Sequence, residues 1–124
     1  MRYFREIKVW EKGHLLVLDV YAATQDFPRE EVYGLKAQLR RCAASIPANI
    51  AEGCGRNGDA ELRRFLLIAM GSSNELEYHL LLAHDLGFLK PEPYLSLSLK
   101  IREVKRMLSP FINKLRPPPK KLTG

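Results

Sequence analysis

Cysteines and long apolar runs are scarce in this sequence. Only two cysteines, Cys42 and Cys54, occur in 124 residues, too few for a disulfide framework of the kind that stabilises small secreted domains. No stretch approaches the roughly 18 consecutive apolar residues that a membrane-spanning helix needs. The apolar run from Leu15 to Val20 is too short for a secretion signal and is interrupted by Asp19. We therefore expect a protein of the reducing cytoplasm, without a membrane partner.

Acidic residues are scarce in one part of the chain. Nine of the 20 Lys and Arg residues but only two of the 14 Asp and Glu residues lie between Lys90 and Gly124, so that segment carries a net charge of +7 and the first 89 residues carry −1. This asymmetry indicates a polyanionic partner or an anionic surface. A solvated helix face followed by a basic tail is the alternative.

Length and composition favour one domain. The chain is 46% hydrophobic and 27% charged, which is ordinary globular composition, and it is long enough for a single core. Pro117, Pro118 and Pro119 are incompatible with a continuing helix. We therefore expect a bundle domain over residues 1–116 and a disordered, Pro-rich basic tail over residues 117–124.

Hydrophobic periodicity predicts two helices in the first half of the chain. The first covers about 8–24. The second covers about 28–52, with Asp26 as a candidate N-cap and Gly53 as its end. Pro47 lies within it among small residues, which favours a kinked helix packed closely against a neighbour. The predicted stripes are Trp10, His14, Val17 and Tyr21, with Val9, Leu16 and Val20 beside them, and Leu35, Leu39, Cys42, Ile46 and Ile50.

Two further helices are predicted in the second half. The third begins at a cap formed by Asn57 or Asp59, continues to about residue 86 and stops at Gly87. The fourth follows Pro91 and should be kinked or frayed near Pro110. The apolar stripe of the third is Phe65, Ile68, Ser72, Leu76, His79, Ala83 and Leu86. That of the fourth, spaced alternately by three and four residues as in a packed helix seam, is Tyr94, Leu97, Ile101, Val104, Leu108, Phe111 and Leu115.

Short connections between four helices predict an all-α fold, an antiparallel up-down-up-down four-helix bundle. The third helix has additional apolar residues outside its main stripe. A helix that is apolar on more than one face lies in a large core or at a subunit interface. In a chain of this length the second explanation is favoured, so we expect a homo-oligomer.

Two sequence patterns resemble ligand sites but lack the required context. Residues 53–58 have the spacing GxGxxG, yet they follow a helix and not a strand, so a helix end and turn is expected in place of a dinucleotide site. His14, His79 and His84 lack the spacing of three or four residues that places ligands on one helix face. We expect no metal and no cofactor.

Three polar residues fall on or near the predicted helix contacts. Asn49, Glu52 and Glu75 are expected to form a structural hydrogen-bond network that fixes helix register. Acid–base catalysis by the carboxylates is the alternative, but it also needs a pocket and a group that positions a substrate. Because the sequence contains no sign of a nucleophile, metal set or phosphate cradle, we do not expect an enzyme.

Basic residues of the fourth helix and tail form the predicted binding surface. Arg102 and Arg106 are four residues apart and lie opposite the apolar seam, so they should face solvent. Lys and Arg at this spacing suit phosphate contacts, which depend on salt and have little sequence preference. The predicted nucleic-acid-binding residues are Lys100, Arg102, Lys105, Arg106, Lys114, Arg116, Lys120 and Lys121.

Several motifs together resemble one known family. They are the segments SIPANIAEG over 45–53 and RFLLIAMGSSNELE over 64–77, with Tyr33-Gly34-Leu35, Arg40-Arg41 and Leu86-Gly87-Phe88-Leu89. This set resembles the bacterial four-helix-bundle proteins encoded in intervening sequences of large-subunit ribosomal RNA genes, over roughly Phe4 to Leu115. The accessory protein of diversity-generating retroelements is more distantly similar.

The resemblance has its own implications. It implies a homopentamer and RNA in preference to DNA as the nucleic acid partner. It also leaves open a second class of function, a scaffold or adaptor that binds a protein such as a reverse transcriptase or part of a ribosomal particle.

Overall fold

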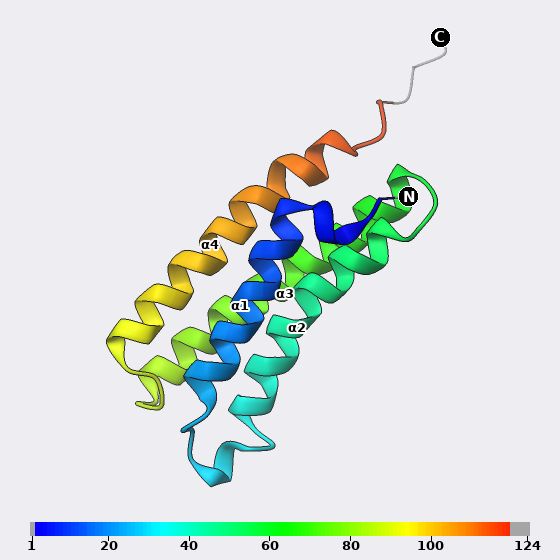
Figure 1. Ribbon diagram of the computed structural model, residues 1–124. Helices are drawn as coiled ribbons and strands as arrows, with labels where there is room; N and C mark the ends of the chain where they lie inside the picture. Colours follow the sequence, from blue (N-terminus) through cyan, green and yellow to red (C-terminus); the bar gives the residue numbers. More distant parts are fainter. Residues whose placement is uncertain (1, 120–124) are drawn as a thin grey trace.

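The computed structural model describes residues 2–119. This part of the chain forms four α-helices and no strands: α1 (Lys8–Thr24), α2 (Leu35–Cys54), α3 (Asp59–Asp85) and α4 (Pro91–Lys114), with short 3-10 helices η1 (Phe4–Glu6) and η2 (Arg29–Glu31). The helices lie along one another in an elongated molecule (Figure 1). The all-α prediction is confirmed. None of the described helices has the length and hydrophobicity to cross a membrane.

The predicted bounds of α1 are confirmed, but its buried face is displaced from the predicted stripe. His14 and Tyr21 are exposed, and the buried residues are Val9, Gly13, Leu16, Val20 and Thr24. Gly13 explains the choice of face, because it lets α2 approach closely. A Cβ atom built on Gly13 would lie 3.4 Å from Ile46 Cγ2 and 3.7 Å from Pro47 Cβ.

The start and end of α2 both differ from the prediction. Asp26 does not cap it, because residues 28–34 form η2 and a turn. The helix begins at Leu35, whose N–H donates to Glu31 Oε2 at 2.9 Å. It continues through Gly53 to Cys54, because Gly53 is a packing residue and not a terminator.

The helix face predicted for α2 is confirmed, with all five stripe residues buried: Leu35, Leu39, Cys42, Ile46 and Ile50. The helix also continues through Pro47, which is itself buried. Its ring lies against Gly13 of α1. The missing backbone donor at Pro47 is therefore accommodated in a close contact between two helices, as the small residues around it predicted.

The N-cap predicted for α3 is wrong. Neither Asn57 nor Asp59 caps it; the N-cap is Gly58, at φ +91°. The predicted stop at Gly87 is confirmed, since Gly87 has φ +84° and the N–H of Phe88 donates to Ala83 O at 2.9 Å. A positive φ at this position is the usual way an α-helix ends.

The buried face of α3 also differs from its predicted stripe. Ile68 and Leu86 are 41% and 56% exposed, and the buried residues are Leu62, Phe65, Leu66, Ala69, Ser73, Leu76, Leu80 and Ala83. Two neighbouring stripes are apolar in this helix. The buried stripe includes Ala69 and Ser73, whose small side chains are compatible with the close approach of α2 at Gly53.

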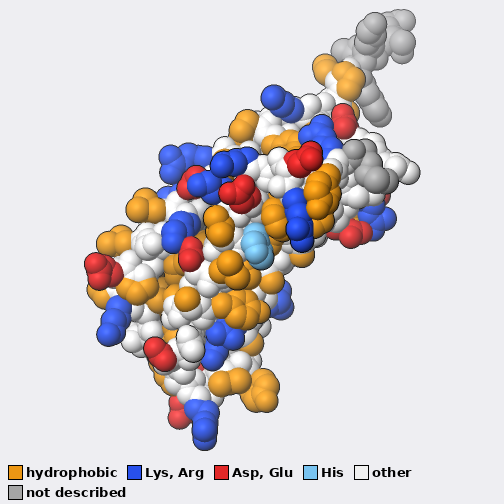
Figure 2. Space-filling view, in the orientation of Figure 1, with side chains coloured by type: hydrophobic (Ala, Val, Ile, Leu, Met, Phe, Trp, Pro, Cys, Tyr) orange, Lys and Arg blue, Asp and Glu red, His pale blue; other side chains and the backbone are white. Residues whose placement is uncertain are grey.

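Apolar side chains remain outside on two separate surfaces. The α1/α4 apolar surface consists of Leu15, Leu18, Leu95 and Leu99, and the α3 apolar surface consists of Leu67, Ile68, Tyr78 and Leu81; all eight are more than 40% exposed. Figure 2 shows hydrophobic side chains gathered over the face that α1 and α4 present to the viewer. The predicted surplus of apolar surface is therefore present, on α1 and α4 as well as on α3.

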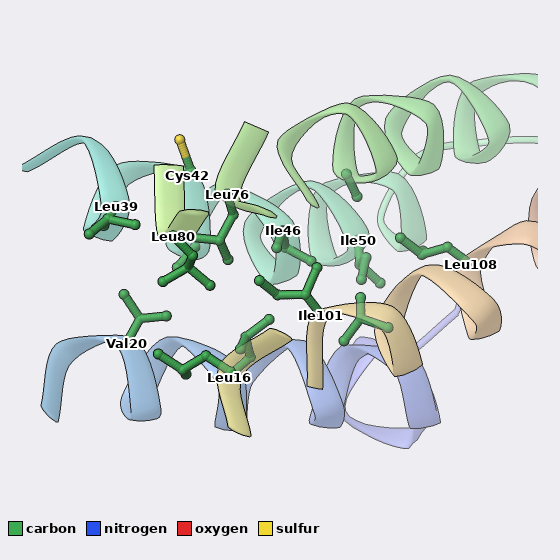
Figure 3. Close-up of a cluster of buried hydrophobic side chains, with 14 of the residues drawn as sticks. Leu16, Val20, Leu39, Cys42, Ile46, Ile50, Leu76, Leu80, Ile101 and Leu108 are labelled. Atoms are coloured by element: carbon green, nitrogen blue, oxygen red, sulfur yellow. The ribbon is translucent and has the colours of Figure 1, made fainter. Parts of the chain in front are cut away.

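The hydrophobic core lies between the four helices. Figure 3 shows side chains from α1, α2, α3 and α4 converging, among them Leu16, Ile46, Leu76 and Ile101. The seam predicted for α4 is confirmed at Leu97, Ile101, Val104, Leu108 and Leu115, which are buried. Near the end of α4, Ile112 is buried while Phe111 is only partly so.

Two glycines give a stability test of the close α2–α3 contact. A Cβ atom on Gly53 would lie 2.9 Å from Phe65 Cβ and 3.3 Å from the carbonyl oxygen of Leu62. We expect Gly53→Ala to lower the free energy of unfolding by about 1–3 kcal/mol through overpacking.

Gly71→Ala is the matched control, because nothing lies within 4 Å of a Cβ atom built at Gly71. It should raise the free energy of unfolding by about 0.5–1 kcal/mol through helix propensity. Urea titrations measure both, and equal effects would contradict the close contact.

Candidate nucleic-acid interface

The basic residues in the middle of α4 lie at the surface beside acidic partners. Lys100 Nζ is 2.7 Å from Asp19 Oδ2 of α1. Glu77 of α3 pairs with two residues, with its carboxylate 3.0 Å from Lys105 Nζ and 3.7 Å from Arg102 Nε. Exposed pairs of this kind contribute little to stability and exchange readily. A phosphate group can therefore compete with these carboxylates.

The cations nearer the end of α4 have no acidic partner within the described part of the chain. Arg106, Lys114 and Arg116 are all exposed, and Arg106 Nε donates only to the carbonyl of Arg102, at 3.4 Å. Figure 2 shows Lys and Arg side chains gathered along α4 toward this end. Lys120 and Lys121 lie outside the described residues.

Two arginines that the sequence interpretation did not single out join this end of α4. The Arg2 guanidinium lies 5.3 Å from the centre of the Phe111 ring. Arg63 of α3 donates from Nε to the carbonyl of Ile112 at 3.3 Å. Neither carries a sequence signal, because Arg2 is 109 residues from Phe111 and Arg63 is 49 residues from Ile112, so only tertiary packing brings them close.

A groove lies among these cations. It has a volume of about 370 Å³ and is lined by Arg2, Met107, Pro110, Phe111, Lys114 and Leu115. Its two charged residues are both cationic and its other walls are apolar or aromatic. This combination can hold a phosphate at the rim and the flat face of a base or sugar against the wall. We call Arg2, Arg63, Arg106, Lys114 and Arg116 the basic end.

Asn49 lies in a polar contact between α2 and α3. Its Nδ2 donates to the carbonyl and hydroxyl oxygens of Ser45, at 2.8 and 2.9 Å. Ser45 Oγ is in turn 2.8 Å from Ser72 Oγ. The contact joins the two motif segments through small polar side chains, in keeping with a structural role for Asn49.

Glu52 and Glu75 lie apart from that contact, and both are exposed. Glu52 Oε1 pairs with Arg56 at 2.7 Å, and Glu75 Oε1 pairs with Arg41 at 2.7 Å. Among the described residues, no hydrogen bond joins any two of Asn49, Glu52 and Glu75. They therefore lie at three separate places on α2 and α3 and do not form the single network that the sequence predicted.

Glu75 instead lies in a cluster with a thiol and an imidazole. Cys42 Sγ is 3.6 Å from His79 Nδ1 and 3.7 Å from Arg41 Nη2. Burial, together with the nearby Glu75 carboxylate, raises the pKa of the Cys42 thiol to about 12. Hydrogen bonding by Cys42 and Arg41 lowers the pKa of Glu75. At neutral pH the cluster therefore holds a neutral thiol and a carboxylate.

Comparison with known proteins identifies the family. Residues 5–110 match the model of the 23S rRNA-intervening sequence protein family. The chain belongs to this family. The match covers all four helices except the last residues of α4, and it confirms the resemblance on which the sequence interpretation relied.

A solved structure has the same fold. It is the crystal structure of a protein of unknown function from the S23 ribosomal protein family of Bacteroides thetaiotaomicron, with a TM-score of 0.79 and 25% sequence identity, covering 85% of this chain and 95% of that chain. No curated protein shows significant sequence similarity to the chain.

Proposed function

We propose that this family member is a non-enzymatic, homo-oligomeric RNA-binding protein of the cytoplasm. The observation that carries the proposal is the basic end, a set of five exposed or half-exposed arginine and lysine side chains, two of which, Arg2 and Lys114, line a groove that has no acidic residue in its lining. The family's connection with 23S ribosomal RNA favours RNA over DNA as the polyanion.

The mode of binding follows from the residues at the basic end. Arg and Lys side chains contact phosphates irrespective of sequence, whereas base reading requires side chains that reach base edges or stack on bases. Phe111 is the one aromatic residue in the groove lining, and the Arg2 guanidinium already lies over its ring. Recognition of RNA backbone and shape is therefore favoured, with Lys100, Arg102 and Lys105 extending the surface along α4.

The protomer in this proposal is an antiparallel up-down-up-down bundle over residues 1–116, followed by a basic tail over 117–124. The α2–α3 connection lies at the same end of the molecule as η1 and the end of α4, and the α1–α2 and α3–α4 connections lie at the other end (Figure 1). Helices joined this way alternate in direction.

Oligomerisation is supported by the two exposed apolar surfaces. They lie on different helices and differ in their residues. A contact between two unlike surfaces is heterologous. Repeated contacts of that type close into a ring when the rotation that relates neighbouring subunits adds up to one full turn. A homopentamer is the form that the family resemblance favours. A ring would multiply the basic ends and raise the avidity for a long RNA.

Salt dependence tests the RNA-binding proposal. If about four cations of each protomer contact phosphates, raising the salt concentration from about 50 mM to about 200 mM should weaken binding by about 50- to 150-fold. Gel-shift titrations of nuclease-treated protein with a structured RNA at both salt concentrations measure this change. Binding that is undetectable at low salt, or that is insensitive to salt, would contradict the proposal. In that case, co-purification of a defined protein would favour the adaptor function.

Light scattering tests the oligomer. We expect nuclease-treated protein to have about five times the chain mass of 14.2 kDa. Leu95 and Leu99 are 60% and 59% exposed, so replacing both with glutamate should leave the protomer folded but place charges in an apolar contact, and the mass should fall to that of one chain. A Val32→Glu/Tyr33→Glu variant adds the same charge in the α1–α2 connection and should stay oligomeric. A wild-type monomer would refute the proposal.

A further inference from the structure

The cluster between α2 and α3 contains three side chains that bind metals. Cys42 lies on α2, and Glu75 and His79 lie four residues apart on one face of α3. One ligand atom from each lies within 4.8 Å of the other two. In Figure 3 the Cys42 side chain points away from Leu16 and Val20 of α1, and its sulfur lies close to His79 of α3. The sulfur is thus on the side of the core that meets Glu75 and His79.

The donor atoms match one class of ion. A thiolate and an imidazole exclude Mg²⁺ and Ca²⁺, which take oxygen ligands, and together with one carboxylate they suit Zn²⁺ and similar divalent transition metals. With Zn–S of about 2.3 Å and Zn–N of about 2.0–2.1 Å, tetrahedral geometry places sulfur and nitrogen about 3.6 Å apart. Cys42 Sγ and His79 Nδ1 are 3.6 Å apart.

The neighbouring charges are compatible with such an ion. Arg41 holds only Oε1 of Glu75, which leaves the other carboxylate oxygen free to act as a ligand. Arg41 also donates to Gln38 Oε1 at 2.6 Å, so it has an anchor of its own. Ligating carboxylates are commonly hydrogen-bonded by a further residue in this way. A thiolate and a carboxylate would neutralise the two charges of the metal.

We propose that Cys42, Glu75 and His79 bind a divalent transition metal ion, with Zn²⁺ as the best fit, and so join α2 to α3. Binding releases the Cys42 proton to solvent, because a thiol coordinates zinc as the thiolate. Three protein ligands leave a fourth position for water. The site is independent of the RNA-binding proposal, since none of its residues belongs to the basic end or to the basic residues of α4.

Cobalt binding to the full chain tests the site, because Co²⁺ bound to a thiolate has a sulfur-to-metal charge-transfer band. Protein stripped of metal with a chelator is titrated with Co²⁺ and then with Zn²⁺. We expect one equivalent of Co²⁺ per chain, a charge-transfer band, and loss of that band as Zn²⁺ displaces the cobalt. Zn²⁺ should also raise the melting temperature. No band and no change in melting temperature would overturn the proposal.

Matched variants distinguish the site from adventitious binding. Residues that only support a ligand change affinity by about 10- to 100-fold, so loss of a ligand in His79→Gln or Cys42→Ser should weaken binding by more than about 100-fold. His84→Gln and Cys54→Ser change the same residue types outside the cluster and should bind like the wild type. His79 is half-exposed, so its variant should fold, which circular dichroism verifies. Equal affinity in all four variants would refute the assignment.

Discussion

Replacing Arg102 and Arg106 together with glutamate should weaken the binding of structured RNA by about 100-fold at low salt. Both side chains are exposed on α4, and each charge-assisted contact with a phosphate contributes about 1.5 kcal/mol. The loss of two such contacts, about 3 kcal/mol, corresponds to roughly two orders of magnitude in affinity. The slope of log affinity against log salt should also fall by about two, because two fewer phosphates are neutralised.

The matched control for this variant is Arg29→Glu/Lys36→Glu. It changes the net charge by the same amount, but its residues lie in and after the α1–α2 connection, at the opposite end of the molecule from the end of α4. It should retain most of the affinity, apart from the effect of net charge, and light scattering should give the same oligomer for both variants. If the two variants lost affinity equally, net charge and not the surface of α4 would account for binding.

Shortening one core side chain should remove a large part of the stability. Leu76 is completely buried where α3 faces the other helices (Figure 3), and Leu76→Ala leaves a cavity in addition to losing apolar burial. Such changes lower the free energy of unfolding by about 3–5 kcal/mol, a large fraction of the roughly 5–15 kcal/mol that stabilises a typical domain. Urea titration should show a lower midpoint with an unchanged slope.

Leu86→Ala provides the comparison on the same helix. Leu86 is the C-cap residue of α3 and is 56% exposed, so the same change of side chain should cost less than about 1 kcal/mol. Both variants must be compared with the wild type at one protein concentration, because an oligomer's apparent stability depends on concentration. A small effect at Leu76 would mean that the core relaxes around the cavity and is loosely packed.

The accuracy of the sequence interpretation varied with the kind of pattern. The seam of α4 was predictable because its spacing of alternately three and four residues continues over the whole helix, whereas the leucines outside the seam, Leu95 and Leu99, occupy only the first half of the helix. Gly87 was predictable because a glycine after an apolar run ends a helix by adopting a positive φ. For α1 and α3, two adjacent stripes are apolar or small, and the sequence contains no information on which of them meets α2.

The candidate sites likewise combine features that the sequence predicted with features that it did not. The exposure of Arg102 and Arg106 followed from their position opposite the α4 seam. The proximity of Arg2 and Arg63 to that helix, and of Cys42 to Glu75 and His79, depends on packing between elements distant in sequence. Local spacing of the three histidines gave no indication of the cluster, since only one of them belongs to it and the other two ligands are of different types.

The sequence by itself determined the all-α class, the approximate extent of most helices, the buried faces of α2 and α4, and the concentration of positive charge in the last quarter of the chain. These properties depend on the order of residues within one helix, where a period of 3.6 residues fixes which side chains share a face. The tertiary structure decided how closely α1, α2 and α3 approach, through small residues such as Gly13 and Gly53, and which distant side chains meet as a result. Such contacts depend on the relative placement of separate helices, a three-dimensional property that no single periodic pattern contains.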